Sequence, residues 1–259
     1  MYSRSVVVVC AVAVFATCAS SAGCRFPPSV WCSSEDIAKE CEVTEACRKN
    51  VWLSATREGA AVPLALYYET LCPDCKNFVQ TQLWPAYQKV GSIMNVTLVP
   101  YGNAWEKQSG SRWEFHCQHG APECQGNVIQ TCAIEILQNF KVYFPFIHCM
   151  ESSEDAPSKS AVQASCAKKF GINYKDIDAC AQGTRGNRLE HQMALKTKRL
   201  NPPHTYVPWV TLHGVHTDKI QKSAEADLIQ LICDTYQGKP PSGCIERLLT
   251  HHKCPRFDL

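Results

Sequence analysis

The chain has 259 residues, with 26 basic and 24 acidic side chains, a formal net charge of +2 and 17 cysteines. This length suffices for one sizeable core and a small module. The near-neutral charge, with no basic run, excludes an electrostatically bound nucleic acid as partner. The cysteine content predicts an oxidising compartment, where disulfides persist.

The first 22 residues have the organisation of a secretory signal peptide. Arg4 precedes an apolar run from Val6 to Cys18, and the small residues ASSAG follow it. Cleavage is expected near Ala22, because a charged start, an apolar run and small residues mark such a site. The run is short for a bilayer span, and a short membrane anchor is the alternative reading. We expect a mature protein without a stable membrane span that enters the secretory pathway.

Residues 24–53 form a separate cysteine-dense segment. Its four cysteines are Cys24, Cys32, Cys41 and Cys47. Because the segment is too short to bury a core of its own, two disulfides are expected to stabilise it. The cysteine spacing, with Trp31 before the second cysteine and Trp52 after the fourth, resembles a saposin A-type domain. Such domains are often processed off precursors, so the resemblance implies trafficking or maturation, and the segment is a candidate propeptide.

Strand and helix patterns alternate from residue 60 onward. The apolar run VPLALYYE predicts a buried strand, and Cys72 begins a helical pattern with Pro73 in its first turn. Pro85 is expected to kink or break that helix. NVTLVPYG predicts a second strand. Strand, helix and strand together predict a right-handed βαβ unit with parallel strands.

The chain changes to helical patterns between residues 115 and about 200, and then returns to strand character. Four helices are predicted at 127–140, 158–170, 174–183 and 186–200. YVPWVTLHGVHT predicts a hairpin that turns at His213-Gly214, and a final amphipathic helix covers 223–236. This order predicts an α/β thioredoxin-like fold at 60–236 with a helical insertion, preceded by the small disulfide-rich saposin A-like module. Residues 237–259 form a cysteine-containing tail.

Cys72 and Cys75, in the sequence CPDC, are the candidate catalytic residues. A structural bridge here closes a tiny loop and stabilises little, and a zinc site needs two more ligands with suitable spacing. The strand before Cys72 and the helix after it favour a redox pair. A helix N-terminus favours the Cys72 thiolate, and Cys75 lies one turn further on, where it resolves a mixed disulfide. No metal is expected to be needed.

The sequon Asn95-Val96-Thr97 is the only N-x-[ST] sequence in the chain. A secretory route makes Asn95 a candidate glycosylation site, provided that this end of the strand is exposed. An unused sequon is the alternative.

Residues 117–132, CQHGAPECQGNVIQTC, resemble the C-Q-H-G-x-x-E-C-x-x-N-x-x-x-x-C signature of gamma-interferon-inducible lysosomal thiol reductases. The eight matching positions are Cys117, Gln118, His119, Gly120, Glu123, Cys124, Asn127 and Cys132. The likeness includes NVTLVPYGNA and YVPWVTLHG and covers about residues 60–254. It implies a thioredoxin-like fold and the reduction of disulfide-bonded proteins in acidic endosomes and lysosomes. In vertebrates, this family serves immunity through antigen processing.

The resemblance also implies roles for individual residues. In thioredoxin-like folds a cis-proline faces the active pair, so Pro208 is expected to be cis and, with Val207, to flank Cys72 beside the substrate. An ordinary trans proline at a strand start is the alternative. The signature cysteines could be zinc ligands, with His119 among them, but in an oxidising route they fit disulfides better. For His119 and Glu123 we expect helix capping and local hydrogen bonds, not catalysis.

Asp74 is the residue that complicates the chemistry of the pair. Its charge suits the start of a helix but opposes a thiolate at Cys72. An ordinary cysteine is almost wholly protonated at lysosomal pH. Either the surroundings acidify Cys72 strongly, or the protein works at a milder pH.

These patterns predict an enzyme, a thiol reductase that acts on protein disulfides through attack by Cys72 and resolution by Cys75. The reductant would be a small thiol such as glutathione or cysteine, with no other cofactor. The expected location is the lysosome or endosome, or outside the cell after secretion. Alternatives are a secretory-pathway oxidase or isomerase and a non-enzymatic secreted binding glycoprotein. The C-terminal RFDL is not a retention signal, which weakens residence in the endoplasmic reticulum.

Nine cysteines lie outside the N-terminal segment and the active pair. Because nine is odd, one of them stays free or joins two chains in a disulfide-linked dimer. Cys254, in the exposed C-terminal tail, is the candidate, unless maturation trims the tail.

Overall fold

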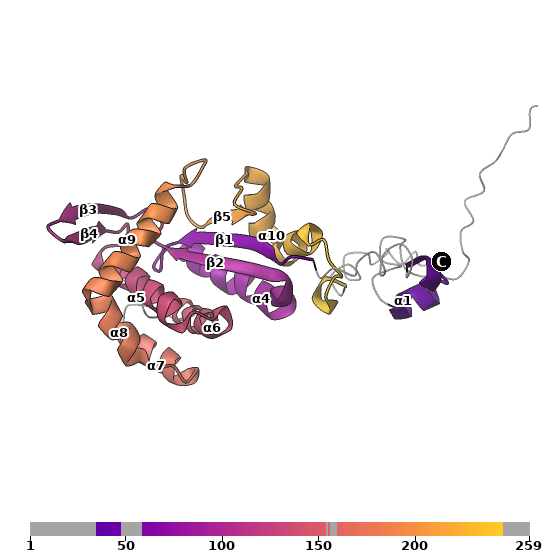
Figure 1. The fold of residues 1–259 in the computed structure, drawn as a ribbon, viewed down its shortest axis with the longest axis horizontal. Helices are drawn as coiled ribbons and strands as arrows, with labels where there is room; N and C mark the ends of the chain where they lie inside the picture. Colours follow the sequence, from indigo (N-terminus) through magenta and orange to yellow (C-terminus); the bar gives the residue numbers. More distant parts are fainter. Residues whose placement is uncertain (1–34, 48–58, 154, 156–159, 246–259) are drawn as a thin grey trace, which may run out of the picture.

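The structure of the chain is a computed structural model, which describes residues 35–47, 59–153, 155 and 160–245 (Figure 1). The predicted signal peptide and Cys254 lie outside the described residues. The N-terminal segment contributes two short helices, α1 (Glu35–Glu40) and α2 (Thr44–Cys47), and its Cys41 is disulfide-bonded. The boundaries predicted for the separate domains stay predictions.

A three-stranded sheet in the order β2-β1-β5 forms the centre of the fold. β1 (Val62–Tyr68) pairs in parallel with β2 (Met94–Pro100) and antiparallel with β5 (Trp209–Leu212). Alternate residues of β1 are buried, as expected for a central strand. The predicted parallel βαβ unit is therefore confirmed, and the chain has a thioredoxin-like fold.

The predicted hairpin after Pro208 is only partly formed. His213 and Gly214 make the turn, both with positive φ, but the returning strand is reduced to one bridge between Leu212 and Val215. The chain then turns His216 inward, where its Nδ1 lies 2.8 Å from the carbonyl oxygen of Val210. The segment after the turn is thus held by the buried His216 side chain, not by further strand pairing.

The helix that follows the CPDC pair continues past Pro85. It runs through α3 (Pro73–Phe78), a π-helical segment (Val79–Leu83) and α4 (Trp84–Val90). Pro85 lies in the first turn of α4. Because proline donates no backbone hydrogen bond, the wider π-helical turn accommodates it without a break. The prediction that Pro85 breaks the helix is thus wrong. Its effect is a change from α-helix to π-helix in the preceding turn.

The helical insertion contains five helices within the described residues. They are α5 (Ala121–Leu137), α6 (Phe140–Glu151), α7 (Ser160–Lys169), α8 (Tyr174–Gln182) and α9 (Thr184–Lys198). The four predicted helices are confirmed as α5, α7, α8 and α9. The sequence analysis missed α6 because Pro145 interrupts its pattern. Burial of Phe144, Phe146 and Ile147 outweighs the cost of this proline.

A two-stranded antiparallel hairpin precedes the insertion and was not predicted. Its strands are β3 (Trp105–Ser109) and β4 (Arg112–His116), so helical structure begins at 121 and not at 115. The hairpin is held by Asn187 of α9, whose Oδ1 accepts from Trp113 N at 2.9 Å and whose Nδ2 donates to Trp113 O at 2.7 Å. Long-range contacts therefore stabilise a hairpin that its largely polar sequence does not predict.

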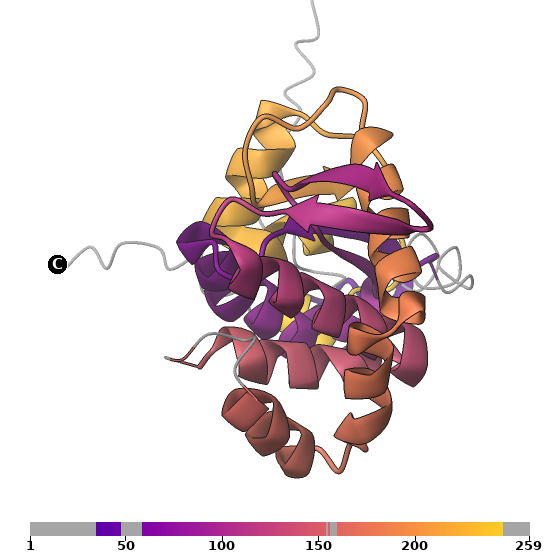
Figure 2. The same ribbon diagram turned by 90° about the vertical axis from the view of Figure 1, so that its left-hand side faces the viewer.

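The views in Figures 1 and 2 show how these elements are arranged. In Figure 1 the β3–β4 hairpin and α5, α7, α8 and α9 lie to the left of and below the sheet, and α10 (Asp218–Thr235) lies to its right. Figure 2 shows the hairpin nearest the viewer, with helices of the insertion below it. α10 packs on β5 and α4, whereas α5 and α9 pack on β2. Among the described residues, none of the helices is long and apolar enough to cross a bilayer.

Eight of the nine cysteines outside the N-terminal segment and the active pair form four disulfides. The bonds are Cys117–Cys124, Cys132–Cys180, Cys149–Cys166 and Cys233–Cys244. The second joins α5 to α8, and the third joins α6 to α7. Disulfides, not zinc, therefore occupy the signature cysteines as predicted, and a dimer through Cys254 stays a prediction.

Two of the buried carboxylic acids in the insertion have strongly raised pKa values. Glu151 of α6 and Glu190 of α9 are both inaccessible to solvent. Glu151 accepts a hydrogen bond from Gln130 at 2.5 Å, and Glu190 accepts one from Thr131 at 2.8 Å. Burial nevertheless dominates and raises the pKa of each carboxyl to about 8.

These pKa values predict that the protein is more stable in mild acid than at pH 8. An acid whose pKa is raised in the folded state contributes its full stabilisation at pH values below its ordinary pKa of 4.5. This stability is lost as the pH rises through 8. The variants Glu151→Gln and Glu190→Gln should therefore flatten the rise in melting temperature between pH 8 and pH 5, measured by circular dichroism.

The matched control for this experiment is Glu135→Gln, because Glu135 is a half-exposed carboxylate on α5. It should leave the pH dependence of the melting temperature unchanged. His148, whose pKa burial lowers to about 4, contributes with the opposite sign below pH 6.5, so the slopes are compared between variants. Equal slopes in all three variants and in the parent protein would contradict the prediction.

Candidate active site

The CPDC pair lies where β1 ends and α3 begins. Cys72 is the N-cap residue of α3, with extended backbone, and its Sγ accepts a hydrogen bond from Cys75 N at 3.4 Å. Pro73 occupies the first turn, as predicted. Cys72 is 7% exposed, Cys75 is fully buried, and both are free thiols. The structure thus holds two free thiols, of which the residue Cys72 is slightly exposed and the residue Cys75 is not.

The two thiols have opposite electrostatic environments. The hydrogen bond from the Cys75 thiol is the largest influence on Cys72 and, with the backbone N–H groups of Cys75 and Asp74, lowers its pKa to about 6. Burial and the charge of Asp74 oppose this effect but are outweighed. Burial raises the pKa of Cys75 far above its ordinary value. Cys72 is therefore the nucleophile that this geometry supports.

A cis-proline faces the pair, as the sequence analysis predicts. The Val207–Pro208 peptide bond is cis, and the carbonyl oxygen of Val207 lies 4.0 Å from Cys72 Sγ. A pocket of about 400 Å³ opens beside this contact. The residues that line it are Asp74, Asn77, Phe78, Gln82, Tyr206, Val207, Pro208 and Glu225. Apolar side chains and two carboxylates thus line a pocket that includes Val207, whose carbonyl oxygen lies near the sulfur.

A buried carboxylic acid, Glu69, follows β1 directly, three residues before Cys72. Its Oε1 accepts a hydrogen bond from the backbone N–H of Asn103 at 2.6 Å, and its side chain is not exposed. Burial, reinforced by the charge of Glu123, raises the pKa of Glu69 to about 7. The sequence analysis did not consider Glu69. An acidic residue directly after a buried strand and close to CPDC is the signal that would have found it.

A second buried acid lies in a hydrogen-bonded chain that starts at the end of β1. The hydroxyl of Tyr68 donates to Gln130 Oε1 at 2.5 Å, and Gln130 Nε2 donates to Glu151 Oε1 at 2.5 Å. The charges of Glu151 and Cys72 are close enough to raise the pKa of the acid. The sequence carries no local signal for this chain, since its members come from β1, α5 and α6.

The family signature holds the loop that leads to the active pair. Asn127 is fully buried on α5, and its Oδ1 accepts from Thr70 N at 3.1 Å. Thr70 Oγ1 in turn donates to the carbonyl oxygen of Glu123 at 3.2 Å. A Cβ on Gly126 would lie 2.4 Å from Thr70 Oγ1, so glycine permits this close approach. The signature thereby fixes residues 69–71 against α5.

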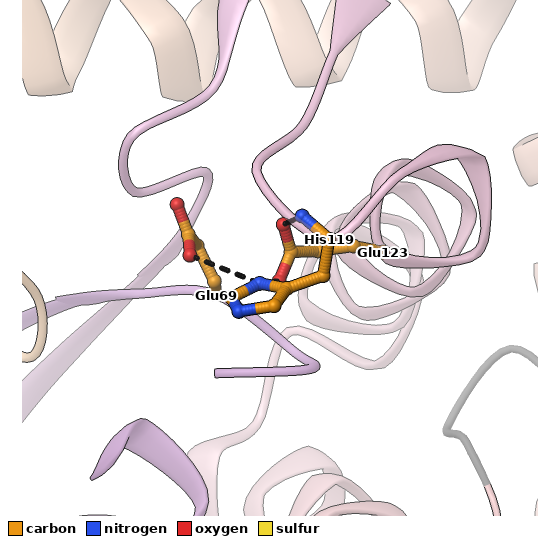
Figure 3. Close-up of side chains that lie close together, drawn as sticks. All are labelled: Glu69, His119 and Glu123. Carbon is orange, nitrogen blue, oxygen red and sulfur yellow. Dashed lines mark hydrogen bonds and ion pairs between the residues drawn. The ribbon is translucent and has the colours of Figure 1, made fainter. Parts of the chain in front are cut away.

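The start of the signature makes a second set of local contacts. Glu123 accepts from the backbone N–H of His119 at 3.0 Å, and its Oε2 lies 2.5 Å from His119 Nδ1. Gly120 has a φ of 81° at the N-cap of α5, a conformation that favours glycine. Gln118 Oε1 accepts from Asn103 Nδ2 at 2.7 Å. The predicted local role of His119 and Glu123 is present, but the fold also brings both to Glu69 (Figure 3).

The predicted glycosylation site, Asn95, lies apart from the CPDC pair and the signature residues. Asn95 is exposed near the start of β2, and Thr97 of the same sequon is exposed as well. Cys72 lies beyond the opposite end of the sheet, after the last residue of β1. The exposure that a glycan on Asn95 requires is therefore available.

Comparison with known proteins identifies close relatives. The family profile described as "Gamma interferon inducible lysosomal thiol reductase (GILT)" matches residues 63–170, which include the CPDC pair and the signature. A saposin A-type domain profile matches residues 21–53, which confirms the predicted N-terminal segment. A gamma-interferon-inducible lysosomal thiol reductase of Carassius auratus is 42% identical over 241 residues, covering 90% of this chain and 92% of that relative.

Two further proteins are similar over most of the thioredoxin-like region. The gamma-interferon-inducible lysosomal thiol reductase of Mus musculus is 38% identical over 186 residues, which are 71% of each chain. Among solved structures, DsbA of Chlamydia trachomatis is 15% identical, with a TM-score of 0.43 over 74% of this chain and 86% of that chain. The fold assignment itself depends on the β2-β1-β5 topology, not on this distant likeness.

The geometry predicts how Cys72 reacts as a function of pH. Its alkylation by iodoacetamide should rise with a midpoint near pH 6, where the thiolate forms. Cys75→Ala should move the midpoint upward, because the hydrogen bond from the Cys75 thiol is the largest stabilising influence. Asp74→Asn should move it slightly downward. A midpoint near 9 in the parent protein would contradict the assignment of Cys72 as the acidified thiol.

A second prediction concerns the signature. Asn127→Ala leaves the buried N–H of Thr70 without its partner, which should cost about 1–3 kcal/mol of unfolding free energy. Gln118→Ala is the matched control, because Gln118 belongs to the same signature but makes an exposed hydrogen bond and should cost less than about 0.5 kcal/mol. Urea denaturation measures both. Equal losses would show that the signature does not clamp the loop through Asn127.

Proposed function

The chain belongs to the gamma-interferon-inducible lysosomal thiol reductase family, and we propose that it reduces protein disulfides at acidic pH in endosomes or lysosomes. Membership of this family makes it a thiol-disulfide oxidoreductase. The reducing direction follows the names of the family and its relatives. The single observation that supports the roles of the two cysteines is the asymmetry of the CPDC pair. Cys72 is acidified and slightly exposed, whereas Cys75 is fully buried and protonated.

The first step is attack by the Cys72 thiolate on one sulfur of a substrate disulfide. A new bond forms between Cys72 Sγ and that sulfur, while the substrate disulfide breaks. The second substrate sulfur leaves as a thiolate and takes a proton from solvent. The pocket beside Pro208 supports this step, since it can hold the polypeptide that flanks the disulfide against Phe78 and Tyr206.

The second step is attack by Cys75 on the Sγ of Cys72. Cys75 loses its proton as it attacks, the Cys72–Cys75 disulfide forms, and the substrate is released with both of its sulfurs reduced. Because the Cys75 N–H already contacts Cys72 Sγ at 3.4 Å, the attacking residue is positioned one turn from its target. A small thiol such as glutathione or cysteine then reduces the pair again, and the proposal includes no other cofactor.

The low pKa of Cys72 supports work in acid. A thiol with a pKa near 6 is ionised to about a tenth at pH 5, whereas one with a pKa near 9 is ionised to about one part in ten thousand. The raised pKa values of Glu69 and Glu151 act in the same direction, because these acids are neutral at pH 5 and do not repel the thiolate. The names of the curated relatives and the signal-like first 22 residues support the lysosomal setting.

One observation favours a second candidate, an oxidase or isomerase of the secretory pathway. A stabilised thiolate stabilises the reduced pair, which makes the oxidised pair a stronger oxidant. The reduction potential of the Cys72–Cys75 pair, measured against glutathione, distinguishes the two. A strongly oxidising value with no reductase turnover would favour the second candidate. Absence of any exchange would instead favour the binding glycoprotein suggested by the saposin A-type segment.

The roles of the two cysteines predict different trapping by their variants. Cys75→Ser should accumulate a mixed disulfide with a disulfide-bonded protein substrate, because Cys72 attacks but nothing resolves the product. Cys72→Ser should trap none. Non-reducing electrophoresis with mass spectrometry measures the adduct, and the double variant is the control. Equal trapping by both single variants would contradict the assigned roles.

Reductase activity of the parent protein should persist from neutral pH down to about pH 5. The assay uses a small thiol as reductant and is run with and without Cys72→Ser. Activity confined to neutral pH would reject the acidic setting while leaving the oxidoreductase assignment intact.

A further inference from the structure

Glu69, His119 and Glu123 form a compact cluster at the end of β1 and the start of α5 (Figure 3). His119 Nδ1 lies 2.5 Å from Glu123 Oε2 and 3.6 Å from Glu69 Oε2. One ligand atom from each residue lies within 4.8 Å of the other two. Both carboxylates are fully buried, while the imidazole is 33% exposed. Two carboxylate oxygens and an imidazole nitrogen thus lie close together, and the imidazole is the partly exposed member.

Within the described residues, this cluster lacks the ammonium group that completes a comparable buried site at Glu106. Glu106 is a close comparison, because it is also unexposed and also contacts a histidine, His191, at 2.9 Å. Lys198 completes that site with its ammonium group 2.7 Å from Glu106. Within the described part of the chain, the only ion-pair partner of Glu69 and Glu123 is His119. Buried charges are ordinarily paired or bound to metals, so this pair of acids has an unfilled requirement for a cation.

A second observation points into the same space. Glu69 Oε2 is buried and accepts no hydrogen bond, although Glu69 Oε1 is bonded to Asn103 N. An unsatisfied buried carboxylate oxygen is costly, and few occur in native proteins. In Figure 3 a dashed line joins this oxygen to the His119 imidazole, 3.6 Å away. The free oxygen is therefore directed at the centre of the cluster.

We propose that Glu69, His119 and Glu123 bind one divalent transition-metal ion, with Zn²⁺ as the best match to this donor set. Zinc takes imidazole nitrogen and carboxylate oxygen at about 2.0–2.2 Å and is usually tetrahedral. A tetrahedral ion at that distance needs its ligand atoms about 3.4 Å apart, a spacing that small rotations of these side chains provide. The ion would replace the proton between His119 Nδ1 and Glu123 Oε2, and water would fill the fourth position.

The position of this site differs from the metal sites weighed for the sequence. Those alternatives used cysteines as ligands, with His119 added at the signature. The proposed site keeps His119 but takes its other ligands from two carboxylates, while the signature cysteines remain in disulfides. Two of the ligands, His119 and Glu123, belong to the signature, and the third is supplied by the loop before Cys72. A bound ion would tie that loop to α5 in addition to the contact between Asn127 and Thr70.

The test uses the full chain as the Cys72→Ser/Cys75→Ser variant, because the free thiols of CPDC would themselves bind zinc. Isothermal titration with Zn²⁺ in thiol-free buffer at pH 7.4 should show one equivalent bound with a Kd in the micromolar range or tighter. Adding Glu69→Gln or His119→Gln should weaken this binding at least tenfold. His191→Gln is the matched control, since it alters the corresponding histidine at Glu106 and should leave the Kd unchanged.

Binding that survives in both the Glu69→Gln and the His119→Gln backgrounds overturns the proposal. Such binding would belong elsewhere, for example to His251 and His252 beside Cys254 in the C-terminal tail. No binding at millimolar Zn²⁺ in the parent variant overturns it as well. Co²⁺ gives a second readout, because a site of nitrogen and oxygen ligands shows no thiolate charge-transfer band. Circular dichroism establishes that each variant is folded, so that a loss of binding reports on the site.

Discussion

The hydrogen bonds that converge on the sulfur of Cys72 are the interaction on which the chemistry of the fold depends. They exist because Cys72 is the N-cap of α3 and Cys75 lies one turn later. The same turn of helix buries Cys75 completely. One thiol therefore loses its proton easily and the other does not, and this difference assigns attack and resolution to different sulfurs. The opposing charge of Asp74 is too weak to reverse the order.

The N-cap geometry requires a fixed loop between β1 and α3, and the signature provides it. Asn127 and the carbonyl of Glu123 hold Thr70, and Gly126 lets α5 approach it closely. Disulfides at both ends of the signature attach α5 to its surroundings. The signature is thus explained by support of the active pair. Its residues contact the loop, and the reacting sulfurs are supplied by α3 and the residue before it.

Buried acids are the second recurring feature of this structure. Glu69, Glu151 and Glu190 are inaccessible, and burial raises the pKa of all three. Neutral acids are compatible with the proposed work at acidic pH, since they neither oppose a thiolate nor require a buried cation. At neutral pH the same groups carry a cost. Glu69 and Glu123 share a partly exposed histidine as ion-pair partner, and the proposed divalent cation would relieve the cost of burying both acids.

The sequence by itself determined the CPDC pair at a strand-to-helix junction, the βαβ unit, four of the five helices of the insertion and the family signature. These features depend on local spacing, apolar periodicity and residue type, which are visible without coordinates. Tertiary structure alone decided the β3–β4 hairpin, helix α6, the partners in each disulfide, and the meeting of Glu69 with His119. These depend on contacts between residues far apart in the chain, such as Asn187 with Trp113 or Gln130 with Tyr68. Local pattern carries no information about such contacts, because packing and burial in the folded chain choose the partners.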